Sequence, residues 1–481
     1  MKSFSSKPDP SSVEKPDDPV RRRLLAATSA GCAAMATAPL LAAARVPGLA
    51  GAEPQPPRAS GEPASDIYAA LRQSTLGALY QTPAVGGLLS YLGALLLPVK
   101  GKTPEQMWRE YTDGRISETV FKLVKADLEG LTGVARLYRD AVASEDSATL
   151  HAQSIAANTQ FVALLPRFQL QGEEIALLPL FAIAATLHLA LLRDIVLKGH
   201  SIGFTDASLD TYRNDLTRLI QDYTGHADRF VAAAMARARD DNPDTGLPAT
   251  RNQPLSAMLA TKATLQLSVI DQRDTWYAFD ATRFPGPKRV WLVRELFTPI
   301  AGWWDLQSKA PDSIPAWESP GFRIDRLEVF VRQQWRTRWL SAFKLHYGDT
   351  DGSLESGEIW GDRYQLALDP SFWITGVRTH FGAGLAMIEL RDTLGRTHRF
   401  GRPAESNEPH VDHAYPGHGL TSIRSVGRAR DSGAAKGAVS GCVYGFCLEQ
   451  PTAATITPAL ASRIAPVIAP ALRDWIAAPV Q

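Results

Sequence analysis

One uninterrupted apolar run, IALLPLFAIAATLHLALL at residues 175–192, constrains the fold more than any other part of the chain. Its only polar side chains are Thr186 and His188. A helix that is apolar on every side is either the buried centre of a helical bundle or a membrane span. Its length approaches the roughly 20 residues that cross a bilayer. The sequence permits both states, and composition alone favours a buried core helix.

The segments on either side of this run are amphipathic. Apolar residues recur at three- and four-residue steps from Val120 to Tyr138 and again from Leu209 to Val231, which predicts helices. With 45% apolar and 21% charged residues, the chain is typical of a soluble globular protein. The 51 basic and 50 acidic residues nearly cancel, so nucleic acid is not an expected partner. We therefore expect residues 66–285 to form a helical bundle.

From about residue 286 the pattern changes to short β-type runs separated by turn residues. The expected strands are 327–331, 339–347, 372–379, 385–390 and 439–447. The segments FKLHYGDTDGSLESGEIWG and IELRDTLGRTHRFG form a loose internal repeat in which each copy ends in an aromatic residue and a glycine. Repeated sheets around an axis predict a β-prism over residues 286–450, and an irregular sandwich is the alternative. The fold class is α+β multidomain.

The N-terminus resembles an export signal. Three arginines at 21–23 precede an apolar run at 24–44 and the small-residue triplet at 50–52. We expect a signal peptide over 1–52, export by the twin-arginine route, a secreted mature chain from about Glu53, and a linker over 53–65. A general secretion signal is the alternative.

Two further features concern the C-terminal end. Cys442 and Cys447 would form a disulfide if the chain turned at Tyr444 and Gly445, and would otherwise be two buried free thiols. The apolar tail at 451–481 contains an expected helix at 471–478. Covering the β domain, removal by proteolysis and contact with a membrane are three open roles for this tail.

No pattern supports a catalytic, metal or cofactor site. Asp349, Asp351 and Glu358 are spaced for a hairpin turn rather than an EF-hand. A second group lies in a Pro/Gly-rich stretch that we interpret as a solvated loop, with a zinc-dependent hydrolase as the alternative: His410, Asp412, His413 and His418. Five tryptophans fit either a β core or a ligand-facing surface: Trp303, Trp304, Trp335, Trp339 and Trp360.

The helical half resembles domain I of the three-domain insecticidal crystal toxins, the delta-endotoxin or Cry family. Residues 172–199, GEEIALLPLFAIAATLHLALLRDIVLKG, are similar to the central fifth helix of that domain. Five further segments resemble other parts of the family in the same order. Residues 83–98 resemble its first helix, 128–142 its third, 158–175 its fourth, 202–230 its sixth, and 282–302 the crossing into domain II. Thr186 and Ile183 replace a usual asparagine and glutamine. The C-terminal part resembles a jacalin-like or vitelline-outer-layer-like β-prism more weakly.

The resemblance implies a seven-helix bundle whose fourth and fifth helices, here 150–170 and 175–197, enter a membrane as a hairpin. It implies that the following residues belong to the inserting hairpin: Phe161, Leu164, Leu165, Pro166, Leu178, Leu180, Phe181, Leu187, His188, Leu189, Leu192, Arg193 and Asp194. Arg193 and Asp194 would then lie near the headgroups. On its own, His188 is more often a core histidine with satisfied hydrogen bonds than a protonation switch.

The expected function is that of a secreted pore-forming toxin without enzymatic activity. Its β domain would bind a cell-surface receptor or glycan, and its helical hairpin would enter the lipid of the target-cell membrane. An activating protease and a homo-oligomer on the membrane are the other expected partners. The alternative is a lectin-like glycan-binding protein whose helical part is a non-inserting scaffold.

Overall fold

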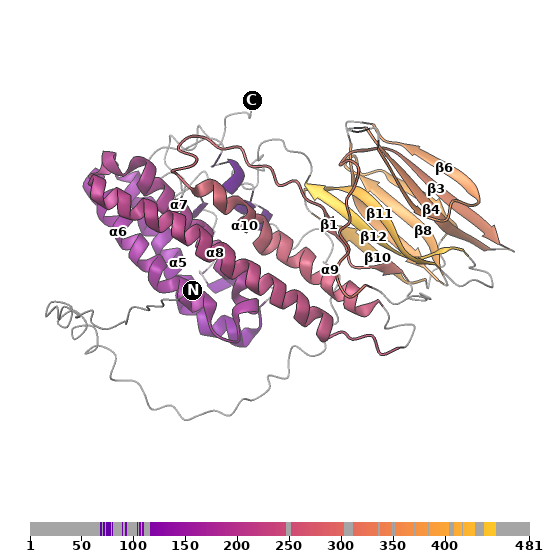
Figure 1. The fold of residues 1–481 in the computed structure, drawn as a ribbon, viewed down its shortest axis with the longest axis horizontal. Coiled ribbons are helices and arrows are strands. Elements are labelled where there is room, and N and C mark those ends of the chain that lie inside the picture. The colour runs from indigo at the N-terminus through magenta and orange to yellow at the C-terminus, as the bar shows by residue number, and fades with distance from the viewer. Residues whose placement is uncertain are drawn as a thin grey trace, which may run out of the picture. The chain divides into compact units, whose positions relative to one another are not determined.

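The computed structural model describes residues 116–246, 252–302 and, with short gaps, 311–448, together with single positions between 68 and 109 (Figure 1). The expected export signal at 1–52, the linker at 53–65 and the tail at 451–481 with its expected helix lie outside these described residues. The same is true of most of residues 66–115, so the expected count of seven helices stays a prediction.

The described helices follow one another through residue 279. They are α5 (Glu118–Ala143), α6 (Ser147–Leu164), α7 (Glu174–Lys198), α8 (Asp206–Asp240), α9 (Gln253–Leu265) and α10 (Asp271–Trp276). Shorter turns join them: η1 (Leu165–Gln169), η2 (Gly199–Ile202), η4 (Gln266–Ile270) and η5 (Tyr277–Phe279). Ser117, Asp146 and Thr205 begin three of the helices, and each side chain accepts a hydrogen bond from a first-turn amide that has no partner within the helix.

Helix α7 lies among α5, α6 and α8 (Figure 1). Every residue from Leu177 to Ile195 is buried. Its neighbours bury only one face each, because their apolar residues recur at helical spacing. The buried residues of α6, for example, are Leu150, Ser154, Ala157, Phe161 and Leu164. A helix without a polar face can be covered only by neighbours on all sides, so it takes the centre.

Among the described residues, the strands begin after residue 295 and form three antiparallel four-stranded sheets. The first has the order β1 (Leu296–Phe297), β12 (Val439–Leu448), β11 (His418–Arg428), with β2 (Ala301–Gly302) also paired to β12. The second has the order β10 (His410–Ala414), β7 (Ile374–Phe381), β8 (Leu385–Asp392), β9 (Thr397–Gly401). The third has the order β5 (Ser353–Gly357), β4 (Thr337–Tyr347), β3 (Ile324–Gln334), β6 (Asp362–Ala367).

All three sheets contribute to one hydrophobic core. Tyr444 and Phe446 from the first sheet, Val377 from the second, and Val329 and Phe343 from the third belong to the same buried cluster. The alternation of side chains along each strand points one set of apolar residues towards the other sheets. The β part is therefore organised by its sheets facing each other.

The glycines that end the two repeat copies have the same role. Gly361 follows Trp360, and Gly401 follows Phe400. Both have positive φ, 105° and 108°. A Cβ at Gly361 would lie 2.3 Å from the carbonyl oxygen of Val331, and one at Gly401 would lie 2.2 Å from that of Ala386. Each glycine thus lets the chain approach the backbone of a neighbouring strand, which no other residue type could do without strain.

The structure decides one alternative and overturns one interpretation in the C-terminal region. Strand β12 continues through Tyr444 and Gly445 without a turn, so Cys442 and Cys447 are the two buried free thiols that were the alternative to a disulfide. Residues 410–418 are not a solvated loop, because they contain β10 and the start of β11. In both cases the glycines indicated a turn, whereas pairing with strands far away in the sequence keeps the chain extended.

Candidate functional site: the central helix and its hairpin

The α6–η1–α7 hairpin contains all the residues expected to insert into a membrane. Phe161, Leu164 and Leu165 are buried on the first arm, whereas Pro166 is exposed in the η1 turn. The residues of the second arm are all buried: Leu178, Leu180, Phe181, Leu187, His188, Leu189, Leu192, Arg193 and Asp194. Within the described residues, Glu174–Ile202 is the only stretch apolar and long enough to span a membrane, and it is mostly buried in the protein.

The buried imidazole of His188 joins three helices. Its Nε2 lies 2.9 Å from Oδ1 of Asn158 on α6, and its Nδ1 lies 2.8 Å from the hydroxyl of Tyr223 on α8. An amide oxygen only accepts, so Nε2 carries the proton and donates, and Nδ1 accepts from Tyr223. Burial lowers the pKa of His188 to about 3. His188 is thus a neutral core histidine with both ring nitrogens satisfied, as favoured from the sequence.

Thr186 makes the other polar contact in the middle of α7. Its hydroxyl donates to the carbonyl oxygen of Ala182 at 2.8 Å and accepts from Nε1 of Trp276 at 2.9 Å. Trp276 ends α10, so this contact ties the central helix to the last helix before the β part. Sequence reasoning missed Asn158, Tyr223 and Trp276 as partners, because only the rotation of each helix in the bundle brings them to α7.

Arg193 and Asp194 are buried in this fold rather than exposed at the end of the hairpin. The guanidinium of Arg193 donates to the carbonyl oxygens of Ala278 and Gly286 at 3.2 and 3.1 Å. Burial lowers the pKa of Arg193, and the carboxylates of Asp194 and Asp280 oppose this shift. Asp194 accepts a hydrogen bond from the amide of Leu89 at 3.2 Å. Their position near headgroups concerns an inserted state and stays a prediction.

A buried charged cluster links the helical part to the β part. Asp271 on α10 accepts from Arg72 at 2.9 Å and also pairs with Arg294, which precedes β1. Burial by itself would raise the pKa of Asp271, but Arg294 and Arg72 outweigh this and hold it at about 2. Arg294 also lies 2.9 Å from Nε2 of His418 on β11. The carboxylate is therefore ionised and fully paired.

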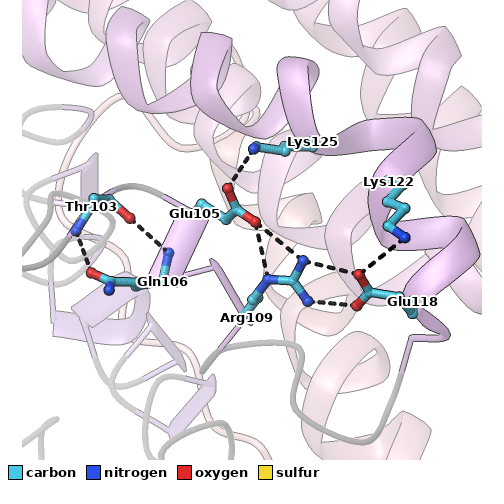
Figure 2. Close-up of polar contacts among 7 residues, drawn as sticks. All are labelled: Thr103, Glu105, Gln106, Arg109, Glu118, Lys122 and Lys125. Carbon is cyan, nitrogen blue, oxygen red and sulfur yellow. Dashed lines mark hydrogen bonds and ion pairs between the residues drawn. The ribbon is translucent and has the colours of Figure 1, made fainter.

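A surface network fastens the segment before α5 to α5 itself (Figure 2). Arg109 bridges Glu105 and Glu118, with nitrogen to oxygen distances of 3.1 and 2.5 Å. Lys125 pairs with Glu105, and Lys122 with Glu118. On the inner side, Nε1 of Trp108 donates to Thr132 at 3.0 Å. None of these residues belongs to the hairpin, so hairpin departure would leave this attachment intact.

The histidines considered for a metal site are not brought together. The ring of His410 lies 5.3 Å from that of His380, while buried His413 contacts Tyr444 from the other side of its strand. Asp412 pairs with Arg378, and His418 with Arg294. Within the described ranges, no group of three or more His, Cys, Asp or Glu side chains could hold a metal ion.

The other sequence candidates are placed as follows. Asp349, Asp351, Trp303, Trp304 and Trp335 lie outside the described residues. Trp339 is buried, as expected of a core residue, whereas Trp360 is exposed and has the guanidinium of Arg332 3.5 Å from its ring centroid. Trp360 is therefore the one described tryptophan of the five that could contact a ligand.

The helical part is similar in sequence to a known domain family. Residues 120–280 match the sequence family described as delta endotoxin, N-terminal domain. The chain is 27% identical over 230 residues to the pesticidal crystal protein Cry1Id of Bacillus thuringiensis, covering 45% of this chain and 31% of that protein. It is 29% identical over 390 residues to Cry7Aa of the same species, covering 71% of this chain and 33% of that protein. The chain thus spans about a third of the length of these curated relatives.

Solved structures share the fold beyond the helical part. The insecticidal crystal protein Cry7Ca1 of Bacillus thuringiensis superposes with a TM-score of 0.66 at 16% identity, covering 81% of this chain and 76% of that one. PirB superposes with a TM-score of 0.63 at 16% identity, covering 80% of this chain and 95% of that one. The predicted resemblance to the delta-endotoxins is confirmed.

Proposed function

Because residues 120–280 are homologous to the delta-endotoxin N-terminal domain, which belongs to a family of pore-forming toxins, we propose that this protein permeabilises membranes by inserting the α6–η1–α7 hairpin. The helical part is similar to a family of non-enzymatic pore formers, so the proposed activity involves no catalysis.

One observation gives the main support for insertion of the hairpin. Helix α7 is long enough to cross a bilayer, yet in this fold it is covered on every side. The backbone hydrogen bonds of a helix lie within its own segment, so α7 could leave the bundle without losing them. On the other arm, α6 carries polar side chains such as His151, Gln153 and Asn158 that could face water in a lumen. Exposed Ile155 and Val162 on α6 could face lipid.

The β part is proposed to be a β-prism that binds a surface receptor or glycan. Its three four-stranded sheets with one common core support the prism. Exposed Trp360, with an arginine on one face of its ring, offers a surface on which a sugar ring could stack. The arginines at 21–23 and the apolar run after them support secretion by the twin-arginine route. Proteolytic activation and assembly into a homo-oligomer complete the proposal.

Dye release from lipid vesicles tests the insertion directly, and a crosslink shows which part moves. A Cβ added at Gly130 on α5 lies 3.7 Å from Cδ2 of Leu164 on α6, so Gly130→Cys with Leu164→Cys places two thiols for a cleavable bifunctional reagent. The matched control is Gly93→Cys with Ala135→Cys, where the new Cβ lies 3.1 Å from that of Ala135 and neither residue belongs to the hairpin. Both pairs are made in a Cys32→Ser background. Cys442 and Cys447 can stay, because they are buried and so protected from the reagent.

We expect the hairpin crosslink to abolish dye release and its cleavage to restore it. The control crosslink should leave release unchanged, because α5 and the segment before it stay together. Equal release from both crosslinked proteins would exclude the hairpin as the inserting element. Vesicles that stay intact with full-length and protease-trimmed protein at acid and alkaline pH would exclude pore formation. Saturable glycan binding without leakage would then favour the lectin-like alternative.

A further inference from the structure

An open cavity of about 340 Å³ lies where the helical part meets the segment that leads to β1. Its walls come from three places in the chain: Thr224 on α8, Arg273 and Asp274 on α10 with Tyr277 after it, and residues 291–294. Arg273 pairs with both Asp274 and Asp228. The charge of Arg273 in the cavity wall is therefore already compensated by carboxylates of the protein itself.

The rim of this cavity carries large, partly exposed apolar side chains, although Arg289 lies over one face of the Trp291 ring. Tyr277, Trp291 and Val293 are 44%, 43% and 69% exposed. All three line the same cavity, so they form one continuous patch, which we call the junction patch. A single exposed apolar side chain needs no explanation, but a patch around a concave surface is typical of a binding site.

Strand β12 ends at the edge of this patch. Leu448, its last residue, pairs with His418. The ring of His418 lies 2.9 Å from the guanidinium of Arg294, which is itself a wall residue of the cavity. Leu448, the last described residue, therefore lies beside the junction patch, and residues 449–481 follow it in the sequence. A tethered segment competes for a nearby site at an effective concentration of the order of millimolar, so even weak apolar contacts would hold it.

The tail has the composition that such a patch would bind. Residues 451–481 are rich in alanine, proline and isoleucine. In the expected helix at 471–478, Leu472, Trp475 and Ile476 recur at three- and four-residue steps and would share one face. We propose that residues 449–481 dock on the junction patch through this face and that they hold the helical bundle in its soluble state.

The position of the patch explains how docking would act on the hairpin. Thr224 follows Tyr223, the partner of His188, and Arg273 to Tyr277 surround Trp276, the partner of Thr186. A docked tail would brace α8 against α10, the two helices that supply these partners to α7. Proteolytic removal of the tail would then loosen both contacts. This regulatory role rests on the proposed pore formation, whereas the docking itself does not.

Thiol labelling of the full chain tests the docking without a membrane. Val293→Cys, in a Cys32→Ser background, reports on the patch. Leu394→Cys is the matched control, because Leu394 is 63% exposed and belongs to the turn after β8. The tail is undocked by Leu472→Glu with Ile476→Glu, and a charge-matched tail control carries Thr455→Glu with Thr457→Glu.

We expect maleimide to label the thiol of Val293→Cys about tenfold faster in the undocked variant than in the parent or the tail control, since a docked segment must open before the thiol reacts. The thiol of Leu394→Cys should react at one rate in all backgrounds. Equal labelling rates of Val293→Cys in all three backgrounds would overturn the docking. The docking would also be overturned if labelling stayed slow in the undocked variant and its rate depended on protein concentration. A second copy of the chain, rather than the tail, would then cover the patch.

Vesicle leakage tests the regulatory role separately. The undocked variant should release dye without proteolysis, at a protein concentration about tenfold below that of the parent. Fast labelling of Val293→Cys without any gain in release would disprove the regulatory role and leave the docking in place. Absence of release from every variant, trimmed protein included, would instead refute the proposed function.

Discussion

Helix α7 and strand β12 are the two most deeply buried apolar segments of the described chain, and they differ in what fixes them. Leu177 to Ile195 of α7 are all buried, as are Val439 to Cys447 of β12. The backbone of α7 bonds to itself, whereas that of β12 bonds to β1, β2 and β11. Removing β12 would break backbone hydrogen bonds that a membrane cannot replace, but removing α7 would not. Burial alone therefore does not decide which segment can move.

The largest effect is expected where strands approach each other most closely. Gly401→Val should destabilise the β part by more than about 3 kcal/mol, because the side chain would meet the backbone of Ala386 at a positive φ. Thermal unfolding followed by circular dichroism measures the loss.

Gly395→Ala is the control for this substitution. Gly395 has φ 77° but nothing within 4 Å of its added Cβ, so only the backbone strain remains, about 1 kcal/mol. Equal losses for the two variants would show that the approach of the strands is not what makes Gly401 necessary.

The second effect concerns pH and the central helix. The folded pKa of His188, about 3, lies below that of an unfolded histidine, about 6.5. The unfolded chain therefore binds more protons between these values, and this contribution to stability is complete above pH 6.5 and is lost as the pH falls. At pH 4 the loss should be about 3 kcal/mol.

Denaturant unfolding between pH 7 and 4 measures this loss, and His188→Gln should flatten the curve because glutamine does not titrate. Burial also lowers the pKa of His413 in the β part, to about 4, so His413 destabilises the fold over about the same range, from pH 6.5 down to 4, and His413→Gln should flatten that contribution of the β part. An unchanged pH profile in His188→Gln would show that other groups control the acid sensitivity of the bundle.

The centre of each part was easier to predict from the sequence than its partners and edges. An all-apolar helix has only one stable place in a bundle, so the position of α7 followed from its sequence, as did the long strands β3, β4, β7, β8 and β12. The edge strands β5, β6 and β9 were missed because they are short and mostly exposed, and so lack the apolar alternation of central strands. The contacts of His188 and Thr186 depend on tertiary packing that periodicity does not encode.

The third effect concerns the polar contacts that hold α7 in the bundle, as distinct from its apolar packing. Thr186→Val preserves the shape of the side chain but leaves Nε1 of Trp276 without its acceptor, which should cost about 1 to 2 kcal/mol. If the hairpin leaves the bundle, the same variant should also release dye faster, because one contact that holds α7 is lost.

Thr211→Val is a control on α8, since the exposed hydroxyl of Thr211 donates only to the carbonyl oxygen of Ala207 within its own helix. A faster release in Thr211→Val than in Thr186→Val would show that the rate does not follow the contacts of α7.

The smallest effect is expected outside the α6–η1–α7 hairpin. Arg109→Gln breaks the bridge between Glu105 and Glu118, but exposed ion pairs are weakened by water and salt. Lys125 and then Arg109 lower the pKa of Glu105, and Arg109 lowers the pKa of Glu118, so these ion pairs contribute above the pKa of an unfolded glutamate and are lost as the pH falls through the lowered values. We expect a slightly lower Tm at neutral pH and low salt, no difference at high salt, and unchanged dye release. A large gain in release would mean that the segment before α5 also has to detach, and the moving unit would then be larger than the hairpin.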